Sequence, residues 1–152
     1  MIDVGMAAPG FALEADDGTT VTLEGLHGSK FVLYFYPKDD TSGCTVEACE
    51  FRDTLPRFAT GAVQVFGVSP DSVASHIRFR DKYDLTFPLL ADTEREAAEA
   101  YGVWKEKSMY GRKYMGIERT TFLIDEEGVV EHVWRKVKAK GHAAAVADVI
   151  GA

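Results

Sequence analysis

The feature that most constrains the fold is a strand–helix–strand pattern between residues 31 and 68. The run 31–36 (Phe-Val-Leu-Tyr-Phe-Tyr) is apolar throughout, which predicts a strand buried on both faces and ended by Pro37. The run 63–68 (Val-Gln-Val-Phe-Gly-Val) predicts a second strand. Between them, apolar side chains recur on one face of a helix: Ala48, Phe51, Leu55, Phe58, Ala59 and Ala62. Short connections imply a right-handed crossover, so we expect the two strands to be parallel neighbours.

The rest of the chain continues this alternation of strands and helices. We expect an early hairpin through residues 21–23, helices over about 72–83 and 94–101, and a last helix around 145–150. Two strands, 120–125 and 129–134, are joined by the turn Glu126-Glu127-Gly128 as an antiparallel hairpin. This order predicts a thioredoxin-like α/β fold, with a central mixed β-sheet flanked by helices.

One residue disagrees with the helical pattern. Pro56 lies inside the first helix, where proline has no N–H to donate and its ring clashes with the preceding turn. We therefore expect a kink or a break near residue 55.

Length and charge limit the classes of function. The chain has 152 residues and no linker or repeat, so we expect residues 1–152 to form a single domain. No apolar run approaches the length of about 18 residues that indicates a membrane span, and the first residues lack the features of a signal peptide. A net charge of −7 argues against nucleic acid and anionic lipid as partners. A cytoplasmic protein is expected.

Two cysteines lie where the central strand gives way to the first helix. Thr41 or Ser42 is expected to cap this helix, which leaves Cys44 in its first turn, beside Gly43. Unpaired N–H groups and the positive end of the helix dipole favour an anion at that position, and a thiolate is such an anion. The alternative is that both cysteines are small buried hydrophobes, but this local context is hard to explain by packing alone.

The spacing of the cysteines separates their surroundings. Cys44 shares the helix face that carries Ala48 and Phe51, whereas Cys49 falls on the far side, near Asp53. In an intact helix their Cα atoms lie roughly 8 to 9 Å apart, beyond the reach of a disulfide. If the two react together, the first turns of the helix must unwind.

Other uses of cysteine fit less well. The spacing is not the C-x-x-C of a thioredoxin-type reductase, and a zinc site requires two more ligands. The four histidines show no partner spacing and are expected to be surface or edge residues: His27, His76, His132 and His142. A papain-like pair of cysteine and histidine stays open, because only the fold decides which histidine approaches the sulfur.

The motif around these cysteines resembles the peroxiredoxins, in particular the atypical bacterioferritin-comigratory-protein (PrxQ) subgroup. The family pattern P-x-x-x-T-x-x-C stands here as Pro37, Thr41 and Cys44, and the subgroup's second cysteine stands as Cys49. The later arginine of the family is matched by Arg119. The resemblance runs almost from end to end of the chain.

The resemblance implies a thiol-dependent peroxidase that reduces hydrogen peroxide and organic hydroperoxides, with no metal, flavin or haem. Cys44 would be the peroxidatic cysteine and Cys49 the resolving cysteine, with a disulfide between them that thioredoxin reduces. Thr41, Arg119 and the N–H groups around Gly43 and Cys44 would bind the peroxide. The chain is expected to be monomeric.

Two further residues are assigned by their positions. Pro37 would shield the site from water. Glu47 lies one turn after Cys44, where its charge opposes a thiolate unless a cation neutralises it, so we expect Glu47 to orient Arg119.

Two rival functions remain at this point: a thiol-disulfide oxidoreductase acting on proteins, and a redox sensor or binding module in which the same disulfide changes a surface. The segment 105–114 carries a local positive charge and two tyrosines. It is interpreted as a solvated loop or hairpin in preference to a docking surface for the reductant.

Overall fold

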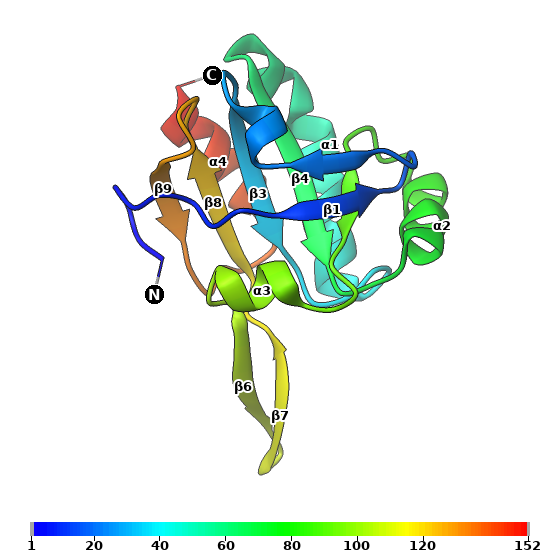
Figure 1. The fold of residues 1–152 in the computed structure, drawn as a ribbon. Coiled ribbons are helices and arrows are strands. Elements are labelled where there is room, and N and C mark those ends of the chain that lie inside the picture. The colour runs from blue at the N-terminus through cyan, green and yellow to red at the C-terminus, as the bar shows by residue number, and fades with distance from the viewer. Residues whose placement is uncertain (1, 152) are drawn as a thin grey trace.

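The centre of the molecule is a mixed β-sheet. A computed structural model describes residues 2–151, and within them seven strands form one sheet in the order β2-β1-β5-β4-β3-β8-β9 (Figure 1). The central strands β3 (Lys30–Phe35) and β4 (Val63–Ser69) are parallel, and β5 (Leu89–Ala91) extends the parallel part. The predicted parallel pairing of the two strands on either side of the first helix is confirmed.

Antiparallel strands complete both sides of this sheet. β8 (Thr120–Ile124) pairs with β3, and β9 (Val130–Trp134) pairs with β8. On the other side, β1 (Ala12–Ala15) pairs with β5 and with β2 (Thr20–Thr22). Both predicted hairpins are therefore present, and the sheet is mixed as expected.

Helices cover the two faces of the sheet. α1 (Ser42–Thr60), α2 (Val73–Tyr83) and α4 (His142–Ile150) share one apolar core with one face. The short α3 (Glu96–Ala100) packs on the opposite face, on the side of β1 (Figure 1), and the 3-10 turn η1 (Glu24–Leu26) follows β2. α3 begins two residues later than predicted, because Arg95 has a φ of 57° and leaves the helical conformation.

Of the kink or break expected near residue 55, the break is wrong. α1 continues through Pro56 to Thr60, and the proline lies exposed on the outer side of the helix. Phe51 and Phe58, on either side of it, are 0% exposed in the core. Each contributes roughly 1.5 to 3 kcal/mol of burial, which together offsets a proline penalty of about 3 kcal/mol.

A second sheet stands apart from the first. β6 (Trp104–Met109) and β7 (Arg112–Ile117) form a two-stranded hairpin that projects from the body of the molecule (Figure 1). Tyr110 at its turn is 97% exposed. This is the hairpin predicted for residues 105–114.

Among residues 2–151, none of the helices has the length and apolar character needed to cross a membrane.

Candidate active site

The candidate site lies at the carboxyl end of β3, where α1 begins. Thr41 is the N-cap residue, and the first hydrogen bond of the helix runs from Thr45 N to Thr41 O, at 2.8 Å. The N–H groups of Gly43 and Cys44 precede that bond, so the helix does not use them. The predicted side-chain cap is not formed, because the Thr41 hydroxyl instead donates to Lys38 O, at 2.9 Å.

Arg119 reaches this helix start from a distant part of the sequence. It directly precedes β8, whose first residue Thr120 pairs with Phe35 at the end of β3. Its Nη2 lies 3.4 Å from Cys44 Sγ, and its Nη1 donates to Glu47 Oε1 at 2.6 Å. The contact expected between Glu47 and Arg119 is therefore present, and the same guanidinium also reaches the sulfur.

Burial shifts the pKa values of Glu47 and Arg119, the two charged groups beside Cys44. Glu47 is 0% exposed, and burial raises the pKa of its carboxyl to about 7, although the positive charge of Arg119 opposes the shift. For Arg119, burial lowers the pKa, but the charges of Glu47 and Cys44 outweigh it and raise the pKa above its usual value. Arg119 is therefore a permanent cation beside the sulfur, and Glu47 is the member of the pair that titrates.

The guanidinium of Arg119 lies directly against the backbone of Gly43. A Cβ added at Gly43 would lie 3.2 Å from Arg119 Nη2, so the absence of a side chain there gives the guanidinium room. Arg119 and Pro37 line a groove of about 490 Å³ that opens to solvent. Cys44 itself is only 2% exposed, so a hydroperoxide reaches the sulfur from this groove only when neighbouring side chains move.

Cys49 lies on the same helix, half-buried, and both cysteines are free thiols. Since α1 is intact over both residues, the two sulfurs cannot bond in this conformation. Directly after Cys49, Glu50 accepts a hydrogen bond from Gly141 N at 2.7 Å, which ties the helix to the start of α4.

A buried polar network, not predicted from the sequence, holds the loop that carries Pro37 and Thr41. Asp39, 7% exposed, accepts from Tyr36 OH at 2.5 Å and from Ser75 Oγ at 2.8 Å. His76 Nδ1 lies 2.7 Å from the same carboxylate, and His76 Nε2 lies 2.9 Å from Leu90 O. Because a carbonyl only accepts hydrogen bonds, Nε2 carries a hydrogen, and a further proton is shared between Nδ1 and Asp39. The network joins the loop to α2 and β5.

The expectation that all four histidines lie at the surface or edge is wrong for two of them. His76 is 0% exposed and His142 is 5% exposed. His142 Nε2 lies 2.8 Å from Thr121 Oγ1, and burial lowers its pKa to about 4, so it is neutral at pH 7. Asp39 falls inside the cysteine motif, but its partners on α2 leave no signal in the local sequence.

Neither histidine makes a hydrogen bond to Cys44 within the described part of the chain; the sulfur instead accepts a hydrogen bond from Arg119. Residues 2–151 also contain no group of three or more His, Cys, Asp or Glu side chains arranged to hold a metal ion.

Comparison with known proteins gives consistent matches. A model of the AhpC/TSA family matches residues 4–133. A putative peroxiredoxin Bcp from Coxiella burnetii is 53% identical over 150 residues, which cover 99% of this chain and 97% of that protein. Peroxiredoxin Bcp from Bacillus subtilis is 52% identical over 94% of this chain and 91% of its own length.

The fold also matches solved structures. One is the bacterioferritin comigratory protein of Xanthomonas campestris, whose study concerned alkyl peroxide reduction and a trapped intermediate or ligand complex. It is 45% identical, with a TM-score of 0.89, over 93% of this chain and 90% of that one.

Proposed function

Because this chain belongs to the AhpC/TSA family, with the Bcp/PrxQ peroxiredoxins as its relatives, it is a thiol-dependent peroxidase, and we propose that Cys44 is the sulfur that attacks the hydroperoxide. One observation carries this assignment: a permanent cation, Arg119, lies 3.4 Å from Cys44 Sγ and is oriented from its other side by Glu47. The position of Cys44 in the first turn of α1 further favours its thiolate form.

In the first step the Cys44 thiolate attacks one oxygen of the hydroperoxide. The S–O bond forms as the O–O bond breaks, and the other oxygen leaves with the electron pair of that bond and takes the proton of the hydroperoxide, as water or an alcohol. The sulfur, oxidised by two electrons, is left as a sulfenate, which takes a proton from water to become a sulfenic acid. Arg119 stabilises the charge that develops on the leaving oxygen, which is where fixed donors contribute most to such a reaction.

The surrounding groups bind the peroxide before it reacts. The hydrogen of the Thr41 hydroxyl points to Lys38 O, so its free lone pairs accept the hydrogen bond of the hydroperoxide O–H. The N–H groups of Gly43 and Cys44 donate to the peroxide oxygens. Pro37, which has no N–H, shields the sulfur from bulk water.

In the second step Cys49 resolves the sulfenic acid. The start of α1 unwinds, Cys49 attacks Cys44, and a disulfide forms with release of water. The hydrogen bond from Gly141 N to Glu50 holds α1 against the start of α4 at residue 50. We therefore expect the unwinding to stop before residue 50 and the rest of α1 to stay packed.

A dithiol reductant then restores both thiols. We assign this role to thioredoxin, and we expect the substrates to include hydrogen peroxide and organic hydroperoxides. The alkyl peroxide reduction studied in the Xanthomonas relative supports the second class. We further propose that residues 1–152 act as a single domain, as a monomer, in the cytoplasm.

The test replaces each cysteine by serine. Cys49→Ser should reduce one equivalent of peroxide and then stop with thioredoxin as the donor, whereas Cys44→Ser should not react at all. Continued turnover of Cys49→Ser with thioredoxin would remove Cys49 from the cycle. Mass mapping of the oxidised wild type should find the disulfide between residues 44 and 49.

A further inference from the structure

The groove beside the candidate site has an unusual charge. The hairpin residues 104–117 carry four basic side chains and one acidic side chain, in a chain whose net charge is −7. The groove is lined by two of these hairpin lysines, Lys105 and Lys107, and by Arg119 and Lys136 from elsewhere in the chain. Two carboxylates, Glu106 and Glu118, line it as well, so basic side chains outnumber acidic ones by four to two. The groove therefore carries an excess of positive charge next to Arg119, the residue that contacts Cys44.

Carboxylates neutralise only part of this charge. Lys105 Nζ lies 3.3 Å from Glu118 Oε1, and Arg119 is paired with Glu47. In the described part of the chain, Lys107 and Lys136 have no ion pair or hydrogen bond. Lys136 is exposed on the segment after β9, next to Val137, whose N–H donates to Arg119 O at 3.0 Å.

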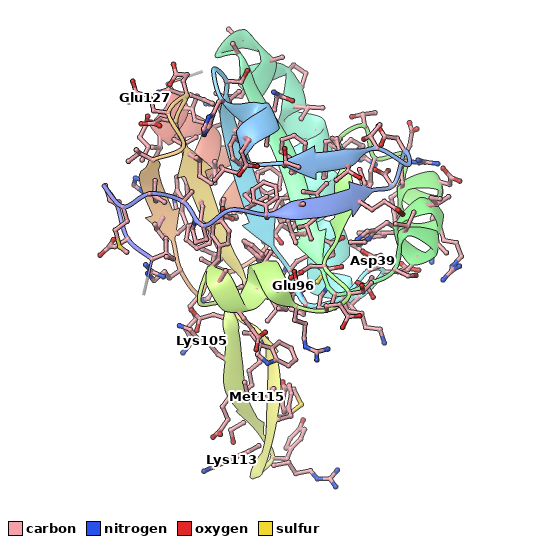
Figure 2. All side chains as sticks on the ribbon, in the orientation of Figure 1. Asp39, Glu96, Lys105, Lys113, Met115 and Glu127 are labelled. Atoms are coloured by element: carbon pink, nitrogen blue, oxygen red, sulfur yellow. The ribbon has the colours of Figure 1, made fainter. Side chains whose placement is uncertain are left out.

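The side chain of Lys107 is held toward the site. A Cβ added at Gly116 would lie 3.3 Å from Lys107 Cδ, so the lysine stem crosses β7 at a position without a side chain. Gly116 pairs with Lys105, which lies two residues closer than Lys107 to the base of the hairpin. The stem therefore runs from the projecting hairpin toward Arg119, and Lys107 is half-buried (Figure 2 shows the hairpin with Lys105, Met115 and Lys113 labelled).

Neighbouring negative charges do not fully stabilise the positive charge of the Lys107 ammonium in this position. Burial lowers its pKa, the positive charge of Arg119 lowers it further, and the charges of Cys44 and Glu118 act in the opposite direction. An anion bound in the groove would replace lost hydration and neutralise the repulsion from Arg119.

We propose that Lys107 binds a carboxylate of the substrate, so that this peroxidase prefers organic hydroperoxides that carry a negative charge a few bonds from the O–O group. The inference rests on the proposed function of Cys44, because the lysine acts on a substrate placed at that sulfur. Arg119 binds the peroxide, Lys107 binds the carboxylate, and the groove holds the carbon chain between them. Lys136 adds positive charge to the lining of the groove.

The experiment compares matched substrates on matched variants. The reduced protein is mixed in a stopped-flow instrument with a tertiary γ-hydroperoxy carboxylate, its methyl ester, or tert-butyl hydroperoxide. The variants are Lys107→Gln and, as control, Lys113→Gln, a lysine of the same hairpin that lies outside the groove with a side chain 76% exposed (Figure 2). Each second-order rate is measured at low and at high salt.

The wild type and Lys113→Gln should oxidise about fivefold faster with the carboxylate than with the ester, as expected for a half-exposed ion pair. High salt should reduce this preference. Lys107→Gln should react equally with both, at the rate of the wild type with the ester.

Three results would overturn the inference. They are the absence of a preference in the wild type, a preference retained in Lys107→Gln, and an equal loss of rate with all three peroxides, which would mean that Lys107 acts on the sulfur. A protein that fails to react with tert-butyl hydroperoxide would instead contradict the role of Cys44.

Discussion

Replacing Glu47 by glutamine should change how the stability of the protein depends on pH. Burial raises the pKa of Glu47 from 4.5 to about 7, so between these pH values the folded state keeps a proton that the unfolded state has released. The wild type therefore loses stability as the pH rises through this range, and the loss is complete above pH 7. A shift of this size corresponds to about 3 kcal/mol. Glutamine has the same shape, and its amide oxygen still accepts a hydrogen bond from Arg119, but it does not titrate.

The assay is urea unfolding of the reduced protein at several values of pH. The free energy of unfolding of Glu47→Gln minus that of the wild type should rise by about 3 kcal/mol from pH 4.5 to pH 7.5. The control is Glu127→Gln, the same chemical change at an exposed turn residue (Figure 2), for which the difference should stay constant. A constant or falling difference for Glu47→Gln would refute the reasoning, because it would mean that Arg119 fully compensates the buried carboxylate.

Three further predictions concern the rest of the site. Arg119→Met should slow the oxidation of Cys44 in stopped-flow measurements by about a hundredfold. It should also lower the free energy of unfolding, because it leaves Glu47 without its cation. Adding Glu47→Gln should restore the free energy of unfolding but not the rate of oxidation. Gly43→Ala should slow the same reaction about tenfold, because the new Cβ would meet Arg119 Nη2 at 3.2 Å, while the free energy of unfolding changes by less than about 1 kcal/mol; an unchanged rate would show that the guanidinium can move. Asp39→Asn should lower the free energy of unfolding by about 3 kcal/mol, because it breaks a buried pair, whereas the exposed Asp40→Asn should lower it by less than about 1 kcal/mol.

Much of the order of the elements was readable from the sequence because it depends on local pattern, but the short strand β5, of only three residues, was not predicted. The apolar run at 31–36, the helical face after it and the run at 63–68 predicted the parallel pair β3 and β4. Where a break of the first helix was expected and is not found, burial decided the outcome. Pro56 should interrupt a helix on local grounds, but Phe51 and Phe58 hold both sides of it in the core.

The sequence by itself determined that a cysteine stands in the first turn of a helix, because strand end, cap and helix start are neighbours along the chain. Only the tertiary structure decided what surrounds the sulfur. Arg119 lies 75 residues from Cys44, and His76 lies 37 residues from Asp39. Their meeting depends on the pairing of β8 with β3 and on the packing of α2. Burial, which shifts the pKa values of Glu47, His142 and Lys107, belongs to the folded molecule and has no counterpart in the order of residues.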